Sequence, residues 1–338
     1  MDMDNEQKSA AAAGNILEIS GLKKYFPFKR GAYVKAVDGV DLYIQRGETL
    51  GLVGESGSGK STVAYMVAGM YQPTEGRILF NGQPLATEAR KRSIKEKGDI
   101  QLVFQDPGGS FNPRRSIKQS FELAMRLHSD CPRQDWDSEI SRLLEMVGLP
   151  GEYKDKQPRS LGGGERQLVS IARALAAKPS LIILDEPTSA LDVSMQANVI
   201  SHLLDLQQKM NLSYLFITHD LSLMRNVASR VAIMYLGRLC EIADTADFFS
   251  RPQHPYTRML LSSIPVATDE EEECKPDKII PEGEIPSPVN LPPGCSFHRR
   301  CPERMDICSQ VRPELQPLGQ GHFIACHRFC GGQTEQEK

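Results

Sequence analysis

The fold is decided by residues 49–68, TLGLVGESGSGKSTVAYMVA. A continuously apolar run ends at Gly54, and residues 54–61, GESGSGKS, fit the pattern G-x-x-x-x-G-K-[ST] of phosphate-binding loops. A helical pattern follows, so backbone N–H groups and a positive helix dipole end would face a phosphate. The stretch, called the P-loop below, predicts a strand–loop–helix unit in which Lys60 bridges the β- and γ-phosphates of a nucleoside triphosphate and the Ser61 hydroxyl binds Mg²⁺.

A second apolar run, residues 181–186 (LIILDE), ends in two adjacent carboxylates. In a largely parallel sheet this end would lie beside the P-loop. Asp185 suits the Mg²⁺ shell, and Glu186 suits a general base that orients and deprotonates an attacking water. Alone, two acids at a strand end usually mark only a solvated edge, but the P-loop favours the catalytic interpretation.

The pattern around these motifs is that of an α/β fold with a mainly parallel sheet. Short apolar runs alternate with helical stretches from residue 16 to about 265, whereas residues 106–178 show only helical patterns and predict an inserted helical subdomain. A charge run and clustered prolines after residue 265 predict a boundary, followed by a Cys-rich C-terminal extension over residues 266–330. Residues 1–15 and 331–338 are expected to be tails without a core.

Composition excludes several classes of protein. The 338 residues carry 40 Lys+Arg against 43 Asp+Glu, a formal net charge of −3, so no overall positive field attracts nucleic acid. The sequence holds no apolar run of the roughly 18 to 20 residues that cross a bilayer and no signal-peptide pattern at its start, which predicts a cytoplasmic protein.

A third element narrows the class. Residues 160–167, SLGGGERQ, followed by IARAL, resemble the signature motif of ABC ATPases. In the same resemblance Gln105 corresponds to the Q-loop, residues 189–192 (SALD) to the D-loop, and His219 to the switch histidine. The resemblance implies a P-loop NTPase fold and a head-to-tail dimer, in which each ATP lies between one chain's P-loop and the other chain's signature.

The resemblance also assigns roles. It implies catalysis by Glu186, His219 and Gln105, and Mg²⁺ binding by Ser61, Gln105 and Asp185. Tyr25 resembles the aromatic residue that stacks on adenine, although its run with Phe26 and Phe28 equally suits a packed ring. The expected nucleotide contacts are Tyr25, Gly54, Glu55, Ser56, Gly57, Ser58, Gly59, Lys60, Ser61, Thr62, Gly162, Gly163, Gly164 and Asp192.

The signature departs from the family pattern Leu-Ser-Gly-Gly-Gln. Gly162 stands in the place of the serine and Glu165 in the place of the glutamine. The missing hydroxyl would donate to the γ-phosphate held by the opposing subunit, and a hydrogen bond to a charged group contributes about 1.5–3 kcal/mol. We therefore predict an asymmetric heterodimer whose weaker ATP site is the one completed by this signature; the alternative is that glycine is tolerated with little loss.

The C-terminal extension resembles that of ATP-binding subunits of oligopeptide and dipeptide permeases, a group that also serves nickel and some oligosaccharides. The residues that carry this resemblance are RPQHPYTR (251–258) and GEIPSPVNLPPGCSFHRRCP (283–302). It implies a peripheral subunit at the cytoplasmic face of the inner membrane, with a second homologous ATPase, two transmembrane permeases and an extracytoplasmic substrate-binding protein as partners. The rival interpretations are a soluble ABC ATPase acting on DNA or ribosomes, and a redox-sensing regulatory subunit.

Four cysteines of the extension form the sequence's second candidate site. Cys295, Cys301, Cys308 and Cys326 are spaced C-x5-C-x6-C-x17-C, which matches neither the tight zinc spacings nor the usual ferredoxin runs. The permease resemblance implies that they bind a [4Fe–4S] cluster. Zinc and thiols without a metal remain alternatives at this stage.

Overall fold

A computed structural model of the chain describes residues 14–264, 276–280, 283–319 and 321–329. The predicted tails up to residue 13 and over residues 331–338 lie outside these ranges. The first strand begins at Asn15.

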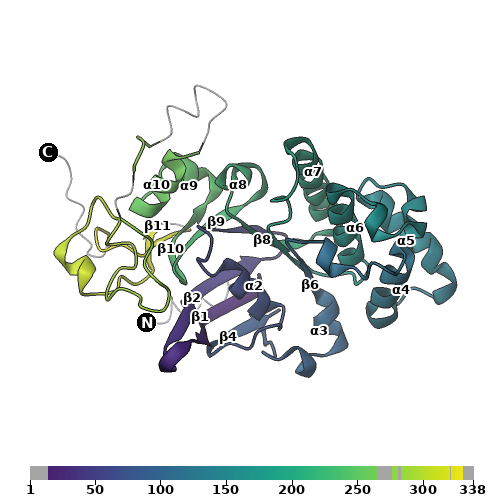
Figure 1. The fold of residues 1–338 in the computed structure, drawn as a ribbon, viewed down its shortest axis with the longest axis horizontal. Coiled ribbons are helices and arrows are strands. Elements are labelled where there is room, and N and C mark those ends of the chain that lie inside the picture. Colours follow the sequence, from purple (N-terminus) through teal and green to yellow (C-terminus); the bar gives the residue numbers. More distant parts are fainter. Residues whose placement is uncertain (1–13, 265–275, 281–282, 320, 330–338) are drawn as a thin grey trace.

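One large sheet runs through the molecule (Figure 1). Within the described residues it contains eight strands in the order β11-β12-β10-β9-β3-β8-β7-β6. These strands are β3 (Thr49–Val53), β6 (Ile100–Val103), β7 (Leu181–Asp185), β8 (Ser213–Thr218), β9 (Arg230–Tyr235), β10 (Arg238–Asp244), β11 (Gln316–Gly319) and β12 (His322–Ile324). Every residue of β3, β7 and β8 is buried, as their apolar runs predict.

The larger sheet is mainly parallel, as the sequence predicts, and has an antiparallel part at one end. Strands β9, β3, β8, β7 and β6 pair in parallel, but β10, β11 and β12 add antiparallel pairs. The change of direction comes from the two-residue turn between β9 and β10, in which Leu236 and Gly237 both have positive φ, as a type I′ hairpin requires. A separate antiparallel sheet, order β2-β1-β4-β5, lies beneath in Figure 1.

Strands of the smaller sheet are β1 (Asn15–Pro27), β2 (Tyr33–Gln45), β4 (Glu75–Phe80) and β5 (Gln83–Pro84). The α-helices are α2 (Lys60–Val67), α3 (Ile94–Asp99), α4 (Ile117–His128), α5 (Trp136–Met146), α6 (Gly163–Leu175), α7 (Val193–Met210), α8 (Leu221–Val227), α9 (Thr245–Ser250) and α10 (Pro255–Ser262). Short 3-10 helices are η1 (Lys29–Gly31), η2 (Ala89–Lys91), η3 (Gly108–Ser110), η4 (Arg133–Asp135), η5 (Gly151–Asp155), η6 (Pro158–Ser160) and η7 (Asp306–Ser309).

Two apolar cores hold these elements together. Helix α2 packs between the two sheets, where Val63 and Met66 join side chains of β1, β2 and β3. Helices α4, α5 and α6 come between β6 and β7 in the sequence, and they gather on one side of the larger sheet. Together with α7 they form a continuous apolar core. Helices α4, α5 and α6 fall within residues 106–178, the range for which the sequence predicts a helical subdomain.

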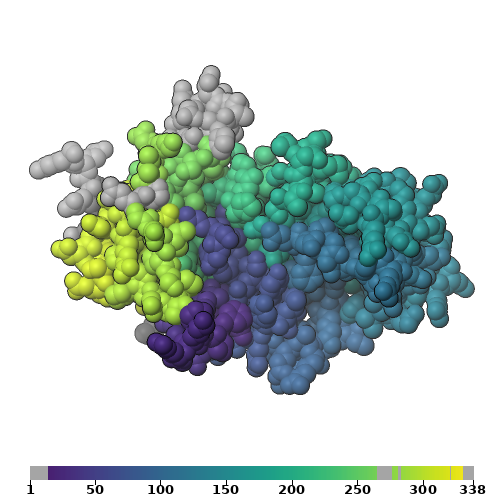
Figure 2. Space-filling view, viewed as in Figure 1, coloured from purple at the N-terminus to yellow at the C-terminus, as the bar shows by residue number. Residues whose placement is uncertain are grey.

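The C-terminal extension packs at the opposite end of the molecule, over β1, β2 and β10 (Figure 2). Its anchor is Phe297, which is 1% exposed and contacts the rings of Tyr235 and Tyr256. Strand β12 adds to the sheet edge by pairing with β10. Phe297 of the extension therefore belongs to the same apolar core as side chains of β9 and β10.

No helix among the described residues is long and apolar enough to cross a membrane.

Candidate nucleotide-binding site

The P-loop joins the buried strand β3 to helix α2 and requires glycine where it passes close to other backbone. At Gly54 a Cβ would lie 2.1 Å from the carbonyl oxygen of Met234, and at Gly59 it would lie 2.1 Å from that of Ala36. Both glycines also have positive φ, which disfavours any side chain. The loop is thus held against β9 and β2.

Lys60 is buried in the loop and bonds its carbonyl groups. Its Nζ donates to the oxygens of Gly54 at 2.8 Å and Glu55 at 3.1 Å. Burial lowers the pKa of Lys60, and the charges of Glu186, Asp185 and Glu55 oppose that shift. The ammonium therefore stands among carboxylates at the position where the P-loop pattern places a phosphate-binding lysine.

Ser61 and Asp185 come together as the sequence predicts. The Ser61 Oγ donates to Asp185 Oδ1 at 2.9 Å, and Asp185 is 1% exposed at the end of β7. Burial raises the pKa of Asp185, while hydrogen bonds from Ser61 and Tyr65 oppose the rise. Two hard oxygen donors side by side at the P-loop are a suitable pair for Mg²⁺.

Tyr65 is a site residue that the sequence analysis missed. It lies one helical turn after Ser61 on α2, and its hydroxyl bonds Asp185. Burial raises the pKa of Tyr65 to about 12, and the Asp185 carboxylate adds to the shift. The i,i+4 spacing from Ser61 was the available signal, because it places both side chains on one helix face.

Of the three predicted catalytic side chains, Gln105 and His219 both contact the third, Glu186. Gln105 Nε2 donates to Glu186 Oε2 at 2.8 Å, and His219 Nδ1 lies 3.3 Å from Glu186 Oε1. Glu186 has a positive φ of 46°, rare for a residue with a side chain. Such local strain clusters at functional sites, where the surrounding structure holds the residue in place.

These groups surround one cavity of about 840 Å³, within the range of small-molecule sites. The P-loop, Gln105, Glu186 and His219 line it, together with Phe26, Leu260 and Pro288. Of the predicted nucleotide contacts, Gly54, Glu55, Ser56, Gly57, Gly59, Lys60, Ser61 and Thr62 line the cavity. Ser58 does not; it is buried behind the loop.

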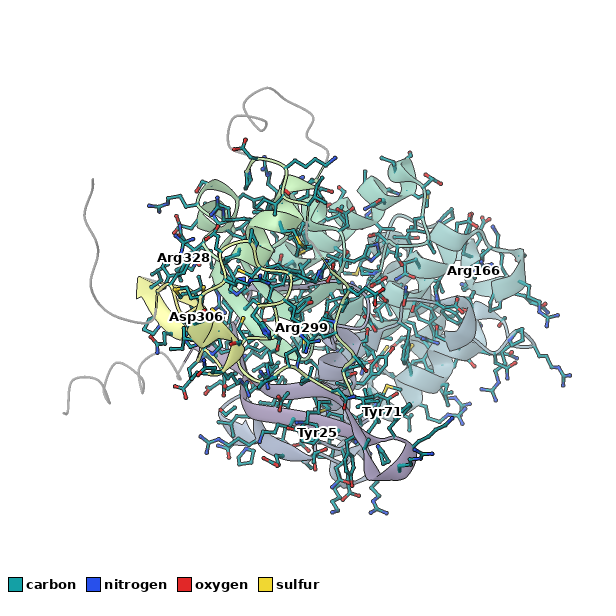
Figure 3. All side chains as sticks on the ribbon, turned by 60° about the vertical axis from the view of Figure 1, so that its left-hand side comes forward. Tyr25, Tyr71, Arg166, Arg299, Asp306 and Arg328 are labelled. Atoms are coloured by element: carbon teal, nitrogen blue, oxygen red, sulfur yellow. The ribbon has the colours of Figure 1, made fainter. Side chains whose placement is uncertain are left out.

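Tyr25 is not among the residues that line this cavity, and the adenine-stacking role predicted for it stays a prediction. The Tyr25 hydroxyl donates to Asp38 Oδ1 at 2.5 Å on the opposite face of β1, while Phe26 lines the cavity. Successive side chains of a strand point to opposite faces, so a one-residue shift changes the face. Figure 3 shows Tyr25 and Tyr71 near each other on the side of the smaller sheet. The Phe26 ring packs against Tyr71 in a T-shaped contact, with 5.3 Å between the ring centroids.

The signature residues lie outside the P-loop cavity. Gly162 precedes helix α6, and its N–H donates to Glu165 Oε2 at 2.7 Å. Gly163 lines a second cavity, which shares Gln105, Glu186 and His219 with the first. In Figure 3 the start of α6, marked by Arg166, lies on the helical side of the molecule, away from the extension.

Asp192, the last of the predicted nucleotide contacts, lies outside both cavities. Its Oδ1 accepts a hydrogen bond from the backbone N–H of Met195 at 2.9 Å and so caps helix α7. Within one chain, therefore, neither Gly162, Gly164 nor Asp192 reaches the P-loop cavity.

The four cysteines of the extension converge on one small cavity. Cys295, Cys301, Cys308 and Cys326 line it, and all four thiols are free. Burial raises the pKa of Cys301 and of Cys326 to about 12. Among the described residues, no group of three or more His, Cys, Asp or Glu side chains is arranged to hold a metal ion.

The fold and the cavity define an ABC-type P-loop ATPase. Residues 37–189 match the ABC transporter family, and residues 240–308 match the oligopeptide/dipeptide transporter C-terminal region. A solved structure of cbiO1 from Clostridium perfringens, part of the ABC transporter complex cbiONQ, is 28% identical with a TM-score of 0.61, covering 70% of this chain and 92% of that one. The ATP-binding cassette MJ0796, solved as a dimer with ADP and Pi, is 25% identical with a TM-score of 0.61, covering 68% and 98%.

Relatives of nearly the same length narrow the family further. The oligopeptide transport ATP-binding protein AppF of Bacillus subtilis is 44% identical, covering 95% of this chain and 99% of that protein. The dipeptide transport ATP-binding protein DppF of Escherichia coli is 40% identical, covering 92% and 93%. The chain belongs to the family of oligopeptide and dipeptide ABC transporter ATP-binding proteins.

Proposed function

We propose that this chain hydrolyses ATP to power peptide uptake through an ABC importer, as a peripheral subunit at the cytoplasmic face of the inner membrane. The observation that supports the ATPase part is that Lys60, Ser61, Gln105, Glu186 and His219 line one cavity, with Asp185 hydrogen-bonded to Ser61. The names of its relatives supply the peptide cargo. Nickel and oligosaccharide are the alternative cargoes.

The residues divide the work by their chemistry. Lys60 and the P-loop N–H groups hold the phosphates, and Phe26 offers a ring face to the base. When bound at Ser61 and Asp185, Mg²⁺ supplies positive charge against the phosphate oxygens. Glu186 accepts the proton of the attacking water. Gln105 and His219 orient the Glu186 carboxylate, from which their side-chain nitrogens lie 2.8 and 3.3 Å away.

The partners proposed are a second homologous ATPase, two transmembrane permeases and an extracytoplasmic substrate-binding protein. The test is to recover the native complex from membranes through a tag on this chain and to identify its components by mass spectrometry. Two permeases with a homologous ATPase support the importer, and a co-purified binding protein can be screened against peptides, nickel and oligosaccharides. Recovery of soluble partners alone would instead support a soluble ABC ATPase.

We also propose that the ATPase dimer is asymmetric, because Gly162 lacks the signature hydroxyl. A serine fits there: Gly162 has φ of −65°, and a Cβ would meet only Glu165 Oε2, at an ordinary 3.6 Å. Gly162→Ser should raise ATP turnover of the assembled complex by about tenfold, the effect of one hydrogen bond to a charged group. Ser160→Ala, a change of similar size in the adjoining loop, is the matched control; turnover unaltered by Gly162→Ser would refute the asymmetry.

For the four cysteines we propose a [4Fe–4S] cluster with a structural role. Four free thiols on one cavity supply the right ligand count. Bound there, the cluster would supply a covalent core to a proline-rich segment.

The cluster is tested on protein purified without oxygen. About four irons and four sulfides per chain, lost in Cys301→Ser but kept in the control Cys131→Ser, are expected. One zinc per chain, or neither metal, would contradict the proposal.

A further inference from the structure

The C-terminal extension reaches the P-loop through one buried arginine. Arg300 donates from Nη1 to Glu55 Oε2 at 3.0 Å and from Nη2 to Glu55 Oε1 at 3.2 Å. The Arg300 side chain is 7% exposed and that of Glu55 is 26% exposed. This two-point contact joins positions that are 245 residues apart in the sequence.

A second contact fixes the same P-loop residue. The backbone N–H of Glu55 donates to the Tyr256 hydroxyl at 3.2 Å, and Tyr256 packs on Phe297 of the extension. Arg300 itself contacts the Tyr235 hydroxyl at 3.4 Å. Both the backbone and the side chain of Glu55 are thus held by groups anchored in, or packed on, the extension.

The charge of Glu55 gives this contact a consequence for ligand binding. Glu55 lines the P-loop cavity, and its carboxylate is close enough to act on the charge of Lys60. An uncompensated carboxylate at the rim of a polyphosphate site repels the ligand, whereas a bidentate guanidinium pair cancels its charge and fixes its position.

We propose that Arg300 is a positioning residue of the ATP site, by which the C-terminal extension neutralises Glu55 and holds the first half of the P-loop for the triphosphate. This inference rests on the proposed function, since it takes ATP as the ligand of the cavity. The extension, which is the region shared with peptide transporters, would then also form part of the ATP site. A loss of structure around Cys301, the residue after Arg300, would then also change the position of the P-loop.

The test compares two single variants whose expected effects have opposite signs. Arg300→Met leaves the Glu55 carboxylate facing the phosphates, so the Kd of the full-length chain for a fluorescent, non-hydrolysable ATP analogue with Mg²⁺ should rise about tenfold. Glu55→Gln leaves the guanidinium as a net positive charge, so the Kd should fall. The double variant should return to within about threefold of the parent, because neither charge is then uncompensated.

Arg312→Met is the matched control. Arg312 also belongs to the extension and donates to the backbone oxygen of Asp38 at 2.8 Å, but it does not line the P-loop cavity. Its removal weakens the attachment of the extension and should leave the Kd for the analogue unchanged. Arg300→Lys, which keeps the charge without the two-point geometry, should fall between the parent and Arg300→Met.

The outcomes separate this inference from the proposed function. If the parent chain fails to bind the analogue, the proposed function falls. If the parent binds and both single variants weaken binding alike, or neither changes it, the contact is only structural and the inference is overturned. Should Arg300→Met not fold, Glu55→Gln decides alone: tighter binding supports the inference and weaker binding overturns it.

Discussion

Truncation of Phe26 tests where the base of the nucleotide binds. Phe26 lines the cavity, whereas the Tyr25 hydroxyl is bonded to Asp38 on the other face of β1. Stacking of a base on an aromatic ring contributes about 1–3 kcal/mol, or roughly 5- to 150-fold in affinity. Because the Phe26 ring already packs against Tyr71 in a T-shaped contact, at 5.3 Å between centroids, we expect the lower part of this range, about tenfold, for Phe26→Ala.

The assay is isothermal titration of the full-length chain with Mg²⁺-ADP and, separately, with Mg²⁺-triphosphate, which has no base to stack. Phe26→Ala should weaken ADP binding and leave triphosphate binding unchanged, and Phe26→Trp should preserve both. Tyr25→Ala is the matched truncation; it should lower stability without changing ADP affinity. A loss of ADP affinity in Tyr25→Ala and not in Phe26→Ala would refute the assignment of faces on β1.

Three further predictions concern the acids of the two sheets. Glu186→Gln should reduce turnover of the assembled complex by at least about a hundredfold and trap its ATP-bound dimer, as measured by single-turnover kinetics and light scattering; unchanged turnover would exclude base catalysis. Glu48→Gln should lower the free energy of unfolding, measured in urea, by about 3–5 kcal/mol. Arg230 pairs with Glu48 at 2.6 Å, so the substitution would leave the buried Arg230 charge uncompensated. The double variant Glu48→Leu/Arg230→Met should recover most of the lost stability. Burial alone would raise the pKa of Asp38, but hydrogen bonds from Tyr25 and Arg238 outweigh it and hold the pKa below its ordinary value, so Asp38 stabilises the fold when ionised. Asp38→Asn should therefore cost about 2 kcal/mol at pH 7, and the gap to the parent should close as pH falls through and below the ordinary pKa of 3.8; a constant gap would contradict the charge argument.

The positions of the proposed catalytic and Mg²⁺-binding residues could be predicted from the sequence because these residues lie at the ends of apolar runs. The carboxyl ends of β3, β7 and β8 meet at one sheet edge, which brings Lys60, Asp185 and His219 together by topology alone. Which of Tyr25 and Phe26 faces the cavity could not be predicted, because face assignment on a strand needs the register, and β1 carries several register shifts against β2. Nor could spacing show that Arg300 meets Glu55, because that contact depends on the tertiary packing of a segment with little regular structure.

The cavity lies where four separate parts of the chain meet. The P-loop comes from the larger sheet, Phe26 from the antiparallel sheet, and Leu260 from α10, on which the extension packs. Gln105, on the segment that leads from β6 toward α4, holds the Glu186 carboxylate at 2.8 Å. Because a hydrogen bond weakens steeply with misalignment, we expect a small rotation of the α4–α6 helices to release Glu186 from the orientation proposed for the general base. We therefore expect the helical region, through Gln105 and the proposed general base Glu186, and the extension, through Arg300 and the P-loop, both to act on the proposed triphosphate site.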